Sequence, residues 1–255
     1  MAIFKSGNPA LNEKTFQKSM VVNQSEVMTE RGTLNKFFLL FLLVMGTASI
    51  TWNAFSQGKD VTSWLWIGLI GGLITAIVLI FKPMWAGFLA PVYALFEGAF
   101  IGGISAMYDF AFKGAATGAA GGIVMQAVGL TFAVVIAMFA LYRFRIIKAT
   151  EKFKSVVIIA TMGIGIFYLL SMVLRMFNID MPLIHSSGTM GIVFSLVVVG
   201  IAALNLILDF DRIEEGAAMG APKYMEWYGA FGLLVTIVWL YLEILRLLSK
   251  LNSRN

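Results

Sequence analysis

Long apolar stretches recur along this chain, and they constrain its fold more than any other feature. The last of them runs from Trp227 to Leu248 and carries one acidic residue, Glu243, in its second half. Roughly 20 apolar residues form a helix that crosses the hydrocarbon core of a bilayer, which is about 30 Å thick. A charged carboxylate facing lipid costs several kcal/mol, so we expect Glu243 to face protein or a water-filled cavity.

Six further apolar stretches precede this one, and together they predict an all-α integral membrane protein with seven transmembrane helices. Charged residues make up 13% of the chain, about half of the share in soluble domains, and they collect between the stretches. The mean hydropathy of +0.85 agrees with a polytopic membrane protein. The first six spans are expected at about 37–54, 64–81, 85–107, 118 or 123 to 141, 156–176 and 190–208.

The charges also predict how the chain is organised around the membrane. Residues 1–35 form a polar tail, residues 36–250 the transmembrane domain and residues 251–255 a short second tail; within the first tail, residues 8–20 are a weak candidate for a surface helix. No secretory signal is expected, because this start lacks a short apolar core. Most of the 19 Lys and Arg fall on inner segments if the N-terminus is inside, so the positive-inside rule predicts a cytoplasmic N-terminus. The basic residues near the C-terminus disagree with this orientation.

Several kinds of chemistry find no support in the sequence. The chain has no cysteine, and its one histidine, His185, lies in an expected loop, so no zinc-like spacing occurs. The chain also lacks a phosphate-binding loop, a nucleophile elbow and a metalloprotease motif, so we expect neither a cofactor nor an enzyme. Because the basic residues sit at span ends, we expect a lipid bilayer and no nucleic acid as partner. What remains is carboxylate chemistry: cation binding, proton exchange, or both.

Glu97 and Asp209 are two candidate carboxylates for this chemistry. Glu97 either lines a cavity or is a protonated acid bonded across helices for packing, and the adjacent Gly98 and Gly102 would let a neighbouring helix approach closely. Asp209 follows Asn205 by one helical turn, which gives a polar stripe. Arg212, three residues further on, could instead form a local ion pair with Asp209.

Glu243 has two similar interpretations. It either lines the site or pairs locally with Arg246, with both groups reaching toward the membrane surface. For Asp211, Glu214 and Glu215 we favour a solvated helix end with local ion pairs.

The chain resembles the Bax inhibitor (transmembrane Bax inhibitor motif) family, and within it the bacterial YccA-like branch. Four segments carry the resemblance together with the NPALNEKTF start: EGAFIGGIS, GIVMQAVGLTFAVVIAMFALYRFRIIKAT, LDFDRIEEG and LYLEILRLL. The resemblance implies a seven-helix fold whose last helix is central and surrounded by the other six. It also implies either a pH-sensitive calcium leak, gated by acidic residues on helices six and seven, or a modulator of membrane proteolysis or cell death.

The resemblance places the helix-six acid at Asp209 and the helix-seven acid at Glu243, which are therefore the possible calcium ligands. The gap between them is longer than the family pattern implies. A hairpin turning near 217–220 would put Asp209 level with about residue 229 and close to Glu226, with Glu243 roughly 20 Å further along. Three pairings remain open: Asp209 with Glu226, Glu243 with Glu97, or Asp209 with Glu243 through an irregular connection after Gly216.

We therefore expect a pH-sensitive cation (calcium) leak in the bacterial inner membrane, in which two coupled carboxylates share a proton. The ion-binding and gating candidates are Asp209, Glu243, Glu97 and Glu226, and the passing ions are calcium or protons. The alternative is a non-conducting regulator that binds a membrane protease or another membrane protein. Its discriminating feature would be the polar N-terminal tail, which a channel does not obviously need.

Overall fold

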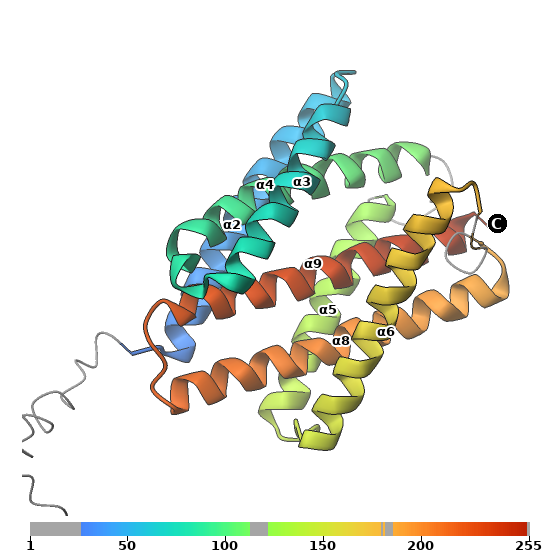
Figure 1. Cartoon of the computed structure of the whole chain (residues 1–255). Coiled ribbons are helices and arrows are strands. Elements are labelled where there is room, and N and C mark those ends of the chain that lie inside the picture. Colours follow the sequence, from blue (N-terminus) through green and yellow to red (C-terminus); the bar gives the residue numbers. More distant parts are fainter. Residues whose placement is uncertain (1–26, 113–121, 180, 182–185, 254–255) are drawn as a thin grey trace, which may run out of the picture.

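The computed structural model describes residues 27–112, 122–179, 181 and 186–253, and in this part seven long helices form one bundle (Figure 1). Each helix is long and apolar enough to cross a membrane, which confirms the predicted seven-span all-α architecture. The possible surface helix at 8–20 and His185 lie outside the described residues. The helices are α2 (Glu30–Ser56), α3 (Thr62–Phe81), α4 (Ala86–Ala111), α5 (Ile123–Arg143), α6 (Glu151–Met176), α8 (Thr189–Ala218) and α9 (Met225–Asn252).

The helix positions follow the sequence prediction, and α8 extends beyond its membrane span into the acidic segment. The turn predicted at Lys82 and Pro83 is present, because α3 ends at Phe81 and a short 3-10 helix, η3 (Pro83–Trp85), leads into α4. The helix α8 continues past the expected membrane span at 190–208 to Ala218, next to the turn expected near 217–220. Its acidic last part is held by partners on neighbouring helices, described below, so polarity does not end the helix there.

The last helix, α9, lies at the centre of the bundle, as Figure 1 shows for the red ribbon. About 61% of the apolar stretch of α9 that would cross the membrane is buried, the largest share of any described helix. It packs directly against α2, α4, α5 and α8, whereas α3 packs mainly on α4 and α6 on α8. The central position of the last helix is thus confirmed, with four helices in direct packing and two further out.

Two clusters of buried apolar side chains meet along α9. One joins α9 to α5 and α8 through residues such as Leu206 and Leu240, neither of which has any exposed surface. The other joins α9 to α2, α3 and α4 through residues such as Leu40 and Leu234. α9 therefore holds the two halves of the bundle together.

Small residues bring α2 and α4 into close contact, as predicted from Gly98 and Gly102. A Cβ atom added at Gly102 would lie 2.6 Å from the Cα atom of Ala48, and one at Gly98 would lie 2.9 Å from the Cα atom of Val44. No side chain fits at such distances, so the two helix backbones touch in the manner of small-residue membrane packing.

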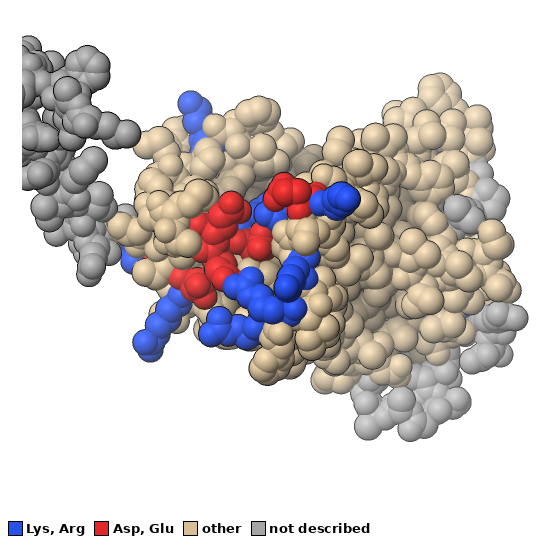
Figure 2. Space-filling view, turned by 90° about the horizontal axis from the view of Figure 1, so that it is seen from below, with Lys and Arg blue, Asp and Glu red and all other residues tan. Residues whose placement is uncertain are grey.

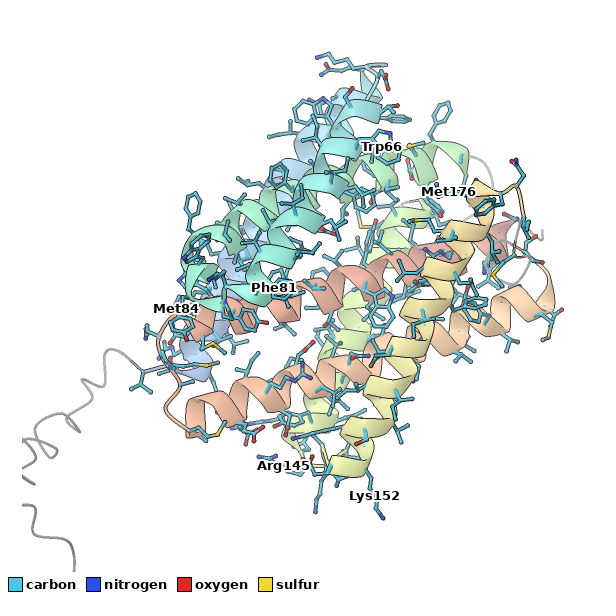
Figure 3. The ribbon with its side chains drawn as sticks, in the orientation of Figure 1. Trp66, Phe81, Met84, Arg145, Lys152 and Met176 are labelled. Atoms are coloured by element: carbon cyan, nitrogen blue, oxygen red, sulfur yellow. The ribbon has the colours of Figure 1, made fainter. Side chains whose placement is uncertain are left out.

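The outer faces of the bundle are apolar, and aromatic side chains flank them. Trp64 and Trp66 at the start of α3 and Trp85 beyond its end are about half exposed, as expected for residues at the two membrane interfaces. Figure 3 shows Trp66 at one end of this span and Phe81 and Met84 at the other. The 20 residues of α3 span about 30 Å, the thickness of a bilayer core.

We predict that Gly102→Ala lowers the free energy of unfolding by about 1–3 kcal/mol, because the added methyl group forces α2 and α4 apart. Thermal unfolding of the purified protein in detergent measures this change. The matched control is Gly129→Ala on α5, where an added Cβ meets no atom within 4 Å. There the better helix propensity of alanine should leave stability unchanged or raised. Equal effects of the two substitutions would contradict the close-contact interpretation.

Candidate functional site

Asp209 lies on α8, in the half of the helix that ends at Ala218, and one of its carboxylate oxygens has no hydrogen-bond partner among the described residues. Its Oδ2 atom is buried and accepts no hydrogen bond from the described residues. The polar groups nearest its carboxyl are the Thr236 hydroxyl on α9 and, at longer range, Arg212. The expected local ion pair with Arg212 is not among the salt bridges of the described residues. Because buried polar atoms nearly always have a partner, this orphaned oxygen marks Asp209 as a candidate site.

The polar stripe predicted from Asn205 to Asp209 leads toward α6 and α9. The Asn205 side-chain amide donates to the Thr161 hydroxyl on α6 at 2.7 Å and to the Ile201 carbonyl at 2.8 Å. Asn205 is thus satisfied within the bundle, one turn from Asp209, which is not.

The predicted register between Asp209 and the last helix is wrong. Because α8 runs to Ala218 and the turn occupies 219–224, Asp209 lies opposite Thr236 and not near residue 229. Glu226 is accordingly ten residues from the level of Asp209, about 15 Å along α9. Glu243 lies seven residues beyond Thr236, about 10 Å along α9 in the other direction. The structure therefore brings Asp209 together with neither acid.

Glu243 is held by an ion pair and two further donors. The guanidinium of Arg246 donates to both carboxylate oxygens at 2.8 Å, and Tyr168 of α6 and Trp239 donate to Oε1 at 3.0 and 3.2 Å. Arg246 also donates to the Tyr168 hydroxyl at 2.7 Å. The geometry therefore supports the local ion pair of Glu243 with Arg246. Tyr168, which the sequence did not predict, bonds to both residues.

Glu226 ties the chain before α2 to the start of α9. Its carboxylate is 1% exposed and accepts hydrogen bonds from the backbone and hydroxyl of Thr29, both at 2.9 Å. Lys223 lies 2.9 Å away, and Lys36 on α2 makes a second ion pair with it. A backbone bond from Met28 to Ala221 and a bridge between Val27 and Pro222 add to this attachment. Glu226 thus connects the start of the first described transmembrane helix to the start of the last one.

Glu97 faces α3 and not α9. It is half-buried one turn from Tyr93, its nearest polar neighbour. A Cβ atom added at Gly72 of α3 would lie 3.3 Å from Glu97 Oε2, so the two helices are close at this level. The possible pair of Glu97 with Glu243 is therefore not formed, since Glu243 is bonded to Tyr168, Trp239 and Arg246.

The remaining acids at this end of α8 are bound in ion pairs that cross between helices. Tyr142 donates to Glu214 at 2.6 Å, Arg145 pairs with Glu214, and Lys154 lies 2.8 Å from Asp211. We call this end, with Lys36, Lys223, Glu226 and these residues, the charged end. Figure 2 shows its acidic and basic side chains gathered on one face, and Figure 3 shows Arg145 and Lys152 there. The expected solvated end with ion pairs is present, but the pairs join α5, α6 and α8.

Lys250, near the C-terminal end of α9, explains the basic residues that disagreed with the positive-inside pattern. It is 5% exposed and donates to the Gly191 carbonyl at 3.0 Å and to the Ser195 hydroxyl at 2.8 Å in the first turns of α8. Arg246 is likewise held by Glu243. Lys250 and Arg246 are therefore bound within the bundle, so their positions say little about the orientation of the protein in the membrane.

The family comparison agrees with this fold. The sequence model of the Bax inhibitor 1 like family matches residues 8–253, nearly the whole chain. The chain belongs to the Bax inhibitor 1 like family. The resemblance noted in the LYLEILRLL and LDFDRIEEG segments is thereby confirmed at the level of the family. Searches of curated proteins and of solved structures gave no match.

Several of the contacts around the acids could not be read from the sequence. Tyr168, Lys36 and Thr29 lie far along the chain from the carboxylates that they contact, and no periodicity links them. Lys154 and Arg145 had a weak signal, since basic residues at a span end suit the acids of a neighbouring span end. Among the described residues, no group of three or more His, Cys, Asp or Glu could hold a metal ion.

We predict that Arg246→Met destabilises the protein by about 3 kcal/mol, because it leaves the buried Glu243 without its cation. The figure is at the low end of the range since the Arg246 side chain is 33% exposed. The double variant Arg246→Met with Glu243→Gln should regain part of this loss, as measured by unfolding of all variants in one detergent. A double variant no more stable than Arg246→Met would refute a buried ion pair.

We also predict that Glu226→Gln speeds hydrogen exchange of the backbone amides in residues 27–36 by about tenfold or more, because the ion pairs to Lys36 and Lys223 are lost. Mass spectrometry of the peptides measures the rates. Glu215→Gln on the same end of the bundle is the control, since its carboxylate is 55% exposed and lies 3.9 Å from its nearest cation. Unchanged rates in Glu226→Gln would show that the attachment does not depend on the carboxylate.

Proposed function

We propose that this member of the Bax inhibitor 1 like family is a pH-sensitive cation leak of the calcium type, in which Asp209 is the group that binds the cation or a proton. The observation that carries the proposal is the buried Oδ2 atom of Asp209 without a hydrogen-bond partner among the described residues. Ionisable groups inside a membrane are rare and commonly lie on ion or proton pathways.

The surroundings of Asp209 support a controlled route. Asp211, at the charged end, lies less than one helical turn from Asp209. The acidic side chains at that end raise the local concentration of cations. On the other side, Leu206 and Leu240 are fully buried one turn beyond Asp209 and Thr236. Such an apolar layer can keep a pathway closed until α8 and α9 separate.

The other carboxylates take supporting roles in this proposal. Glu243 fixes Arg246 and Tyr168, and Glu226 fixes the chain before α2, so both position helices around Asp209 and do not pass ions themselves. Glu97 remains a candidate on the α3 side of the bundle. We further propose that the charged end faces the cytoplasm of a bacterial inner membrane, because Lys and Arg are concentrated there.

We predict that Asp209→Asn flattens the pH dependence of calcium flux into liposomes between pH 6 and 8, because an amide cannot take up a proton. Asp211→Asn is the matched control, since Asp211 lies two residues away on the same helix but pairs with Lys154 at 2.8 Å. It should keep the pH response of the unaltered protein. Flux no greater than that of empty liposomes would refute the leak, and the same pH response in Asp209→Asn would refute the role of Asp209.

The alternative function, a regulator that binds a membrane protease, is favoured by one observation. Val27 to Thr29 are fixed to the start of α9 through Pro222, Ala221 and Glu226, so residues 1–26 join the domain at the charged end. Deletion of residues 1–26 preserves these contacts, whereas deletion through residue 30 would remove Thr29. If deletion of residues 1–26 abolishes protease binding and leaves flux unchanged, the N-terminal tail serves the regulatory function.

A further inference from the structure

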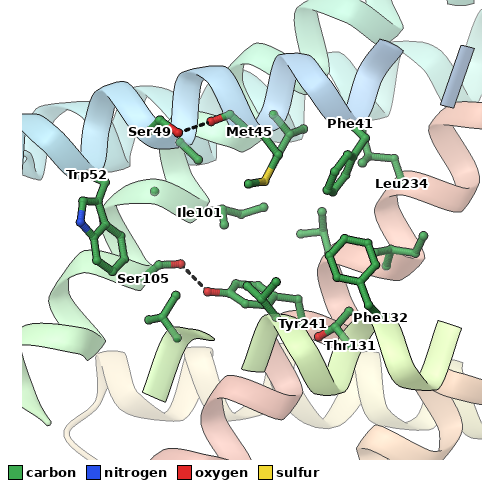
Figure 4. Close-up of a pocket in the computed structure, with 17 residues that line it drawn as sticks. Phe41, Met45, Ser49, Trp52, Ile101, Ser105, Thr131, Phe132, Leu234 and Tyr241 are labelled. Carbon is green, nitrogen blue, oxygen red and sulfur yellow. Dashed lines mark hydrogen bonds between the residues drawn. The ribbon is translucent and has the colours of Figure 1, made fainter. Parts of the chain in front are cut away.

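An apolar cavity of about 290 Å³ lies between α2, α4, α5 and α9, away from Asp209 (Figure 4). Phe41, Phe132 and Leu234 line one end of it, and Trp52, Ser105 and Tyr241 line the other. The volume lies near the lower end of the range for small-molecule sites, which is roughly 300–1,000 Å³.

The cavity is accessible from the lipid side. α2 and α5 are not among the helix pairs that pack extensively, and in the described residues Phe41 and Phe132 meet edge to face with centroids 5.7 Å apart. Met45 and Phe132 line the cavity and are 46% and 44% exposed. Hydrocarbon chains of the bilayer can therefore enter between the two helices.

The length of the cavity suits an acyl chain. Phe41 and Trp52 lie three turns apart on α2, about 16 Å along the helix axis. One leaflet of a bilayer core is about 15 Å thick, half of the whole core. The cavity thus runs nearly the depth of the leaflet that adjoins the C-terminal end of α2.

A pair of hydroxyl groups lies at the Trp52 end. The hydroxyls of Ser105 and Tyr241 are 2.6 Å apart, and both residues are more than nine-tenths buried. One of their two hydrogens serves this bond, and no other bond of either hydroxyl is found among the described residues. A donor hydrogen thus remains for an acceptor, such as an ester carbonyl, that enters the cavity.

A second pocket, of about 360 Å³, adjoins the cavity at Trp52, which lines both. Its lining is more polar than that of the first cavity, because it includes Ser56, Lys59 and Asp109 beside its aromatic residues. A cation and a carboxylate in one pocket match the two charges of a zwitterionic head group, a phosphate and an ammonium.

We propose that these two pockets form a binding site for one phospholipid with a zwitterionic, ammonium-bearing head group. One acyl chain lies in the apolar cavity toward Phe41, an ester carbonyl accepts a hydrogen bond from the Ser105–Tyr241 pair, and the head group lies between Lys59 and Asp109. The order of apolar, hydroxyl and charged groups along the site is the order of groups along such a lipid. This site does not depend on the leak proposed above.

The test uses the full chain in liposomes that contain phosphatidylethanolamine with a photoreactive group at the end of one acyl chain. We expect label at Phe41 and Phe132 in excess over Leu42 and Ile136, which face lipid on the same helices and are 68% and 65% exposed. Label distributed in proportion to exposure would overturn the site, and this comparison needs no variant.

Val128→Phe, which fills the cavity, should reduce the label at Phe41 by about tenfold. Leu130→Phe on the same helix is the matched control, since Leu130 is 46% exposed and does not line the cavity. It should leave the label unchanged. Equal labelling of the two folded variants would overturn the site.

Competition with unlabelled lipids tests the head-group part. Phosphatidylethanolamine should displace the probe at roughly tenfold lower concentration than diacylglycerol or phosphatidylglycerol. Lys59→Gln should weaken the preference over diacylglycerol, which lacks the phosphate, and Asp109→Asn should remove the preference over phosphatidylglycerol, which lacks the ammonium. Equal competition by all three lipids would overturn the assignment of the head group to Lys59 and Asp109.

Discussion

The structure depends on how the central helix satisfies its charged groups in a solvent that offers no hydrogen bonds. α9 carries four charged residues that have partners within the bundle. Glu226 is bound by Lys36 and Thr29. Glu243 and Arg246 bind each other and Tyr168, and Lys250 binds Ser195. A charge buried in hydrocarbon is tolerated only when it is paired or bonded in this way. Because the partners come from α2, α6 and α8, satisfying the charges of α9 also fixes the helices around it.

Against this background, Asp209 stands out by contrast. The acids on either side of it along the bundle axis are bound: Glu243 by Arg246, and Asp211 by Lys154. Asp209 instead keeps a buried oxygen without a partner in the described part of the chain. An unmatched group among matched ones has a free energy that a cation or a proton would lower, which is the physical basis of the function that we propose.

Packing without charges determines the other half of the molecule. Gly98 and Gly102 let the backbones of α2 and α4 touch, and α3 covers α4 on the lipid side. Beside this tight interface, α2 meets α5 through the rings of Phe41 and Phe132, and the apolar cavity lies between the two helices.

The sequence by itself determined the number of spans, the family and the close approach at Gly98 and Gly102, because length, hydropathy and small-residue spacing are local properties. It also contained the local pair of Glu243 with Arg246, three residues apart on one helix. Only the tertiary structure decided that the turn after α8 occupies 219–224 instead of 217–220, and this shift moves Asp209 opposite Thr236. Partners distant along the chain, such as Tyr168 for Glu243 and Thr29 for Glu226, were likewise decided by packing, because no local pattern records which helices become neighbours.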